Sequence, residues 1–143
     1  MKKLVLFVSV LALGLTSCSK DDDGGSSASL EGKWEYSKDG MSVNGNEALL
    51  DYDHSENCPK DYMQITATTV VDHYFYNDGT PECDEEIDSS TYTRDGNTLS
   101  VTVDGTTYTG EILQLDGSTL KIATEEEEVQ GQNVRYITVY TRR

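Results

Sequence analysis

The sequence is short of basic residues and of histidine, and it lacks the common motifs of nucleotide binding and nucleophilic catalysis. The 11 Lys and Arg residues face 26 Asp and Glu residues, so the formal net charge is −15 at pH 7. Binding to nucleic acid needs clustered Lys and Arg to neutralise phosphates, so this composition argues against a nucleic-acid partner. Without a phosphate-cradling glycine loop or a serine-nucleophile motif, the sequence predicts no catalytic residue and no cofactor.

Long apolar runs are also missing, apart from one at residues 4–15. Lys2 and Lys3 precede this run and two small residues follow it, which is typical of an export signal, and the run is too short for a transmembrane helix of about 20 residues. Leu-Thr-Ser-Cys at residues 15–18 resembles the bacterial lipobox. The resemblance implies a lipoprotein signal peptide at residues 1–17 and acyl chains on Cys18. The alternative is an ordinary signal peptide followed by a chance cysteine.

Residues 18–29 carry Asp, Gly and Ser but almost no apolar side chains, which indicates a flexible acidic tether. Lys-Asp-Asp at residues 20–22 resembles the surface-export signal of Bacteroidetes lipoproteins, so we expect an outer-membrane lipoprotein that is exposed at the cell surface. Removing Lys2 and Lys3 leaves 9 basic residues against 26 acidic ones, a net charge of −17. Membrane attachment is therefore expected through the lipid anchor and not through the fold.

Cysteine is scarce, with three residues in the chain. Once Cys18 is assigned to the lipid, Cys58 and Cys83 remain, and an exported chain folds in an oxidising compartment. The sequence therefore predicts one disulfide, closing a loop of about 25 residues and contributing roughly 3 kcal/mol. The alternatives are metal ligation or a catalytic thiol. Zinc would need a second Cys/His pair beside His54 and Cys58, and none matches, so no metal site is predicted.

From residue 30 onward, sustained helical periodicity is absent, and short runs rich in Thr, Val, Tyr and Ile alternate with Gly-containing turns. We expect one all-β domain over residues 30–143 and a monomer, with a short helix or cap at most at residues 46–52. Eight strands are predicted, near residues 30–36, 61–67, 69–77, 86–94, 97–104, 106–114, 118–125 and 133–142. Their short connections suit an eight-stranded antiparallel up-and-down barrel, although strand order alone leaves a sandwich open.

The first strand carries a Gly-x-Trp motif, Gly32 and Trp34, that resembles the signature of the lipocalin/calycin barrels. The order of lipobox, acidic tether, first strand, cysteine pair and final strand resembles the lipocalin-like domains of Bacteroidetes lipoproteins. The resemblance implies a lipocalin-like barrel in which the first-strand Trp packs beneath an Arg of the last strand and closes the barrel. Arg142 is the expected partner of Trp34, with Arg135 and Arg143 as alternatives.

Tyrosine is frequent, with nine residues against two phenylalanines. Such rings stabilise strand pairing, and they also offer a ligand both area and a hydroxyl group. The candidate ligand contacts on predicted strands are Tyr74, Tyr76, Tyr108, Tyr136 and Tyr140.

We expect a non-enzymatic lipoprotein whose barrel binds a small amphipathic ligand, because an eight-stranded barrel is either filled by side chains or holds one small molecule. The main alternative is a surface interaction module with a filled barrel that engages a protein or glycan through its loops. A third interpretation is an inhibitor or scaffold of an envelope enzyme. Inward-facing side chains too bulky to leave a cavity would favour the filled barrel.

Overall fold

The computed structural model describes residues 28–143, so the expected signal peptide, Cys18 and the tether up to residue 27 lie outside the described residues. The described chain forms ten strands: β1 (Gly32–Val43), β2 (Asn46–Asp51), β3 (Tyr62–Ile65), β4 (Thr69–Tyr76), β5 (Asp84–Asp95), β6 (Thr98–Val103), β7 (Thr106–Leu115), β8 (Thr119–Thr124), β9 (Glu127–Val129) and β10 (Gln132–Arg142). Within residues 28–143, no helix is long and apolar enough to cross a membrane.

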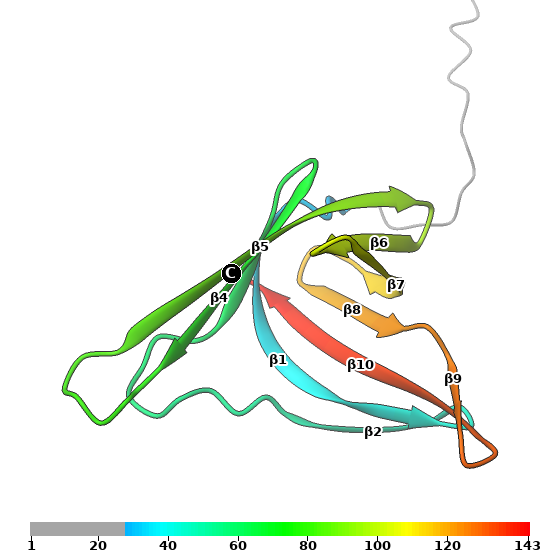
Figure 1. The fold of residues 1–143 in the computed structure, drawn as a ribbon, viewed down its shortest axis with the longest axis horizontal. Helices are drawn as coiled ribbons and strands as arrows, with labels where there is room; N and C mark the ends of the chain where they lie inside the picture. Colours follow the sequence, from blue (N-terminus) through cyan, green and yellow to red (C-terminus); the bar gives the residue numbers. More distant parts are fainter. Residues whose placement is uncertain (1–27) are drawn as a thin grey trace, which may run out of the picture.

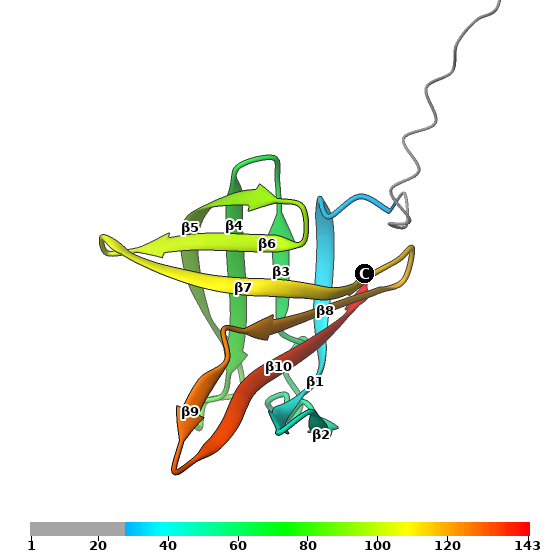
Figure 2. The same ribbon diagram turned by 90° about the vertical axis from the view of Figure 1, so that its right-hand side faces the viewer.

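Eight of these strands close into an antiparallel barrel (Figures 1 and 2). The hydrogen-bonded order runs β1-β3-β4-β5-β6-β7-β8-β10, and pairing of β1 with β10 closes the ring, with Trp34 opposite Arg142 and Tyr36 opposite Tyr140. The predicted all-β, eight-stranded antiparallel barrel is therefore confirmed, and the sandwich alternative is wrong. Closure gives every strand of the ring a paired neighbour on both sides, whereas each sheet of a sandwich has two edge strands.

Strands β2 and β9 lie outside this ring and were not expected. The second half of β1 pairs with β2 and the start of β10 pairs with β9, so β2-β1-β10-β9 extends the barrel wall beyond the ring (Figure 1). The short helix or cap expected at residues 46–52 is thus wrong. Two-residue turns explain the difference: φ is positive at Asn44 and Gly45, and again at Gln130 and Gly131. Positive φ at both central residues is the geometry of the tight hairpin turn.

The core fills the end of the barrel at which β1 begins and β10 ends. The buried cluster comprises Leu30, Trp34, Tyr36, Met63, Ile65, Leu99, Ile112, Leu120 and Tyr140. Full burial of a large apolar side chain contributes about 1.5–3 kcal/mol, so this cluster provides much of the stability of the barrel.

Burial falls along β6 away from this packed end. Its inward residues are buried at Leu99, half-buried at Val101 and 42% exposed at Val103. Because all three side chains point to the same face of the strand, the gradient shows that the interior is filled at one end only. The other end of the barrel is hollow.

Candidate ligand cavity

The packed end is closed by an arginine over the single tryptophan. The guanidinium of Arg142 lies 4.2 Å from the ring centroid of Trp34, which is fully buried. Arg142 also donates hydrogen bonds to the backbone oxygens of Glu31, at 3.1 Å, and Ser29, at 2.5 Å. The Trp34 Nε1–H donates to the oxygen of Leu30 at 2.8 Å. These contacts tie the segment before β1 to the end of β10.

Gly32 makes room for this arrangement. Its φ is +140°, and a Cβ atom there would lie 2.6 Å from an Nη1 atom of Arg142. The alternative partners of Trp34 lie elsewhere: Arg135 bonds Glu111 at 2.7 Å, and the Arg143 guanidinium lies over the Tyr62 ring. Of the three candidate arginines, the structure therefore places Arg142 over Trp34.

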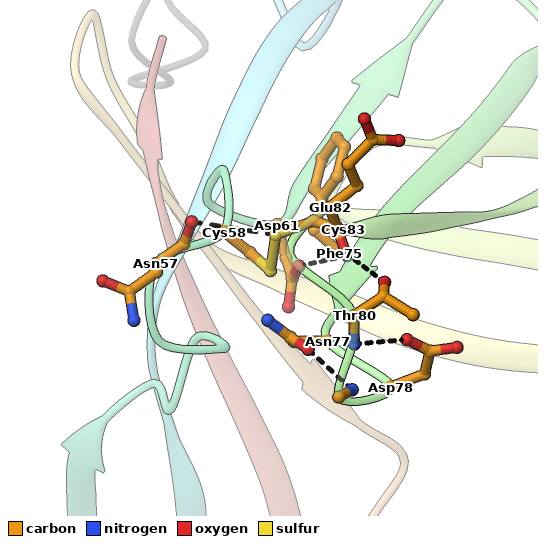
Figure 3. Close-up of a disulfide and its surroundings, with 10 residues drawn as sticks. Asn57, Cys58, Asp61, Phe75, Asn77, Asp78, Thr80, Glu82 and Cys83 are labelled. Carbon is orange, nitrogen blue, oxygen red and sulfur yellow. Dashed lines mark hydrogen bonds between the residues drawn. A yellow bond between two sulfur atoms is a disulfide. The ribbon is translucent and has the colours of Figure 1, made fainter.

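The disulfide between Cys58 and Cys83 is present and joins the β2–β3 connection to the loop between β4 and β5 (Figure 3). Beside it, the buried carboxylate of Asp61 accepts from the backbone N–H of Phe75 at 2.7 Å. The hydroxyl of Tyr52 donates to the second carboxylate oxygen at 3.1 Å. The connection is therefore held against the barrel wall by a covalent bond and by hydrogen bonds to the buried Asp61.

The two histidines are held in structural contacts. His54 Nδ1 accepts from the backbone N–H of Asp61, so Nε2 carries the proton and donates to the oxygen of Tyr36 at 2.9 Å. His73 stacks on the ring of Tyr62 and lies 2.7 Å from a Glu85 oxygen. No group of three His, Cys, Asp or Glu side chains within residues 28–143 is arranged to hold a metal ion.

A cavity of about 540 Å³ occupies the hollow end. Its apolar wall includes Met63, Ile65, Val70, Leu99, Val101 and Ile122. The lining also carries hydroxyl and carboxylate groups. They belong to four tyrosines and three aspartates: Tyr36, Tyr92, Tyr108, Tyr140, Asp72, Asp88 and Asp104. The volume lies within the range of about 300–1,000 Å³ that is typical of small-molecule pockets.

The five predicted tyrosines lie at different depths. Tyr108 and Tyr140 line the cavity, and Tyr74 is half-buried against the core. Tyr76 and Tyr136 are 44% and 58% exposed and are not among its lining residues.

Two lining tyrosines were missing from the predicted ligand contacts, Tyr36 and Tyr92. The alternation of inward and outward side chains along a strand could have indicated both residues. Tyr36 follows Trp34 by two residues on the first strand, and Tyr92 lies on a predicted strand. Residues two apart on a strand face the same way, so the pattern already places Tyr36 on the face of Trp34, and only its role as a cavity-lining residue was not predicted.

A hydrogen-bonded chain of hydroxyl groups leads to one of the aspartates. Tyr36 donates to an Asp72 oxygen at 2.7 Å, and the hydroxyls of Tyr36 and Tyr74 lie 3.0 Å apart. Because Tyr36 uses its proton on Asp72, Tyr74 donates to Tyr36. Burial raises the pKa of Asp72, the Tyr36 hydrogen bond opposes that rise, and the charge of Asp88 adds to it. Burial also raises the pKa of Tyr36 and of Tyr140, so both hydroxyls stay protonated.

The comparison with known families fits this architecture. The family model of the lipocalin-like domain matches residues 30–122, which covers the chain from the start of the barrel into β8. The chain therefore belongs to the lipocalin-like domain family, as the Gly-x-Trp motif indicated. The predicted link to Bacteroidetes lipoproteins stays a prediction.

Among solved structures, the chain is similar to a bovine odorant binding protein, a deswapped triple mutant. The two are 16% identical, with a TM-score of 0.40, and the match covers 78% of this chain and 72% of that one. The search of curated proteins found no match.

Proposed function

We propose that this chain is a non-enzymatic binding protein that holds a small amphipathic ligand in its barrel, anchored by lipid at the surface of the outer membrane. The observation that carries the proposal is the cavity of about 540 Å³, whose wall combines apolar side chains with tyrosine hydroxyls and carboxylates. A pocket that is mostly apolar with a few directed polar groups is the usual form of a small-molecule site.

The cavity also favours the ligand-binding proposal over the filled-barrel alternative. Inward residues such as Val101 and Ile122 are only half-buried and line open space, whereas Ile112 and Leu120 pack into the closed end and do not line the cavity. A filled barrel would bury all four of these residues. The proposal of a small ligand therefore accounts for the half-empty interior, which a loop-binding module does not require.

Binding can be tested with an uncharged fluorescent probe, N-phenyl-1-naphthylamine, on the purified protein. Val101→Trp places a large ring in the cavity, and Thr102→Trp places the same ring on the exposed face of the same strand. We expect saturable probe binding that V101W reduces at least tenfold and T102W leaves unchanged. Equal binding by both variants would contradict the cavity as the site.

Native mass spectrometry of protein purified from its own cells provides a second test of ligand binding. A small molecule that stays with the wild-type protein and is lost from V101W would support the proposal. Repeated release of bare protein from both preparations, together with no probe binding, would contradict it.

The anchor and the location need separate tests, since residues 1–27 carry them. We expect incorporation of radiolabelled palmitate into the wild-type protein and its loss in Cys18→Ser. We also expect protease added to whole cells to degrade the protein. Survival in intact cells, with degradation after lysis, would mean that the lipoprotein faces the periplasm.

A further inference from the structure

The cavity wall carries two carboxylates that face each other across neighbouring strands. Strands β4 and β5 are neighbours in the barrel wall (Figure 2). Asp72 on β4 pairs directly with Asp88 on β5, and both residues line the cavity. Residues directly opposite on an antiparallel pair project to the same face, with Cβ atoms about 5 Å apart. Asp104, at the turn between β6 and β7, adds a third carboxylate to the lining.

No positive charge balances these acids from within the cavity. Among the residues that the structure describes, no Lys, Arg or His lines it. The ion pairs formed within residues 28–143 lie elsewhere, for example Lys121 with Glu47 and Lys60 with Glu35, and none includes Asp72 or Asp88. Like charges directly opposite on a sheet are destabilising, and the charge of Asp88 adds to the raised pKa of Asp72. The Tyr36 hydrogen bond and the interaction with His73 oppose that rise, so an entering cation would relieve the part of the repulsion that remains.

Asp72 is also fixed in position. Its carboxylate accepts from Tyr36, which is buried and is bonded in turn by Tyr74. Two oxygens offer about four acceptor sites, so this hydrogen bond leaves capacity for a donor arriving from the cavity. Burial raises the pKa of Asp72, as expected for a carboxylate in a site with few charge partners.

The rest of the wall suits a hydrocarbon or aromatic group. Leu99, Val101 and Ile122 line the cavity with apolar side chains, and Tyr92 and Tyr140 add aromatic side chains to the lining. Tyrosine rings attract cations as well as apolar groups, so they do not oppose a positive headgroup. A carboxylate headgroup, in contrast, would add a further negative charge beside Asp72 and Asp88.

We propose that the cavity selects an amphipathic organic cation, whose ammonium group lies between Asp72 and Asp88 and whose apolar part packs on Leu99, Val101 and Ile122. This inference rests on the proposed binding function and specifies the chemical class of the ligand. It excludes fatty acids and other anionic amphiphiles as the preferred occupants of the cavity.

Three amphiphiles of equal chain length test the charge preference: decylamine, 1-decanol and decanoate, each below its aggregation limit. Displacement of N-phenyl-1-naphthylamine at pH 7 gives the half-displacing concentration of each compound. We expect decylamine to act at a concentration at least tenfold below that of decanol, and decanoate to be the weakest. The variant Asp72→Asn with Asp88→Asn should raise the decylamine value at least tenfold and leave the decanol value unchanged.

Asp95→Asn serves as the matched control, because it removes a carboxylate at the exposed end of the same strand β5 and should change nothing. Trp34 fluorescence and circular dichroism check that each variant is folded. Equal displacement by decylamine and decanoate in the wild type would overturn the inference, as would a decylamine value unchanged in the double variant. Loss of decylamine binding on addition of equimolar calcium chloride would point to an inorganic cation and would also overturn it.

The outcomes separate this inference from the proposed function. If the probe binds and V101W blocks it, but headgroup charge has no effect, the cavity is a binding site and only the cation inference fails. If the probe and all three amphiphiles fail to bind, as judged also by direct calorimetry, both proposals fail.

Discussion

Replacing Gly32 by alanine tests the closed end of the barrel, because two separate costs meet at this residue. The first cost is conformational: φ is +140°, and a side-chain-bearing residue held in so sparsely populated a region costs about 1–3 kcal/mol. The second is steric: the new Cβ would lie 2.6 Å from a nitrogen of Arg142, so the guanidinium has to move away.

Displacing Arg142 weakens its contact with the Trp34 ring and its hydrogen bonds to two backbone oxygens. A cation–π contact at a partly exposed site contributes about 0.5–1 kcal/mol, and a net hydrogen bond about 0.5–1.5 kcal/mol. Because the arginine is flexible, it retains part of these contacts. We therefore expect Gly32→Ala to lower the free energy of unfolding by about 3 kcal/mol.

Denaturant unfolding followed by Trp34 fluorescence measures this loss directly, since Trp34 is the single tryptophan and is fully buried. Gly45→Ala is the matched control: φ there is +83°, and the space around a Cβ is open, so only the conformational cost applies. Arg142→Ala completes a double-mutant cycle with G32A.

The predicted coupling in that cycle is about 1 kcal/mol, because once Arg142 is absent the alanine at position 32 has nothing to displace. Strict additivity of G32A and R142A would refute the steric part of the reasoning. A G32A protein no less stable than G45A would refute it as well.

Three further outcomes follow from the structure. Replacing Cys58 and Cys83 by serine should cost about 3–4 kcal/mol in the free energy of unfolding, from the loop-closure entropy of a separation of 25 residues, and reduction of the wild type should give the same loss in denaturant unfolding. Asp72→Asn should raise the melting temperature of the empty protein at pH 7 and have no effect below about pH 4, because the raised pKa of Asp72 makes its ionisation cost stability as pH rises; an equal effect at both pH values would contradict this. Leu120→Ala, at a fully buried position, should cost about 3 kcal/mol in chemical unfolding, whereas Leu50→Ala, at a residue that is 76% exposed, should cost less than about 0.5 kcal/mol.

Barrel strands such as β1 and β8 could be predicted from the sequence because one face of each is buried more than the other. β1 alternates around Trp34 and Tyr36, and β8 around Leu120 and Ile122, so a period of two is visible in the residues themselves. β2 and β9 have no such contrast: β9 is exposed throughout, and β2 is exposed at all but Leu49. These two strands are held by backbone hydrogen bonds and by tight turns. Such interactions leave no alternation of apolar and polar residues in the sequence.

The closed end of the barrel was recognisable because its residues form a local motif, with Gly32 and Trp34 two positions apart. The carboxylate pair was not. Asp72 and Asp88 are 2 of 26 acidic residues, and nothing in their neighbourhood along the chain distinguishes them. Only the register of β4 against β5 brings them opposite each other, and only closure of the barrel turns that face inward.

The two ends of the barrel place different demands on the chain. Trp34 and Leu120 are fully buried at the closed end, which therefore contributes apolar burial whether or not the cavity is occupied. The hollow end carries Asp72, whose ionised form is disfavoured by burial and by the charge of Asp88 opposite it. A ligand that binds only the folded state raises the free energy of unfolding. Bound ligand can therefore offset the stability that a buried, ionised carboxylate costs in the empty protein. If the proposed cation binds there, the stability of the closed end offsets the cost of keeping these charges in the empty protein.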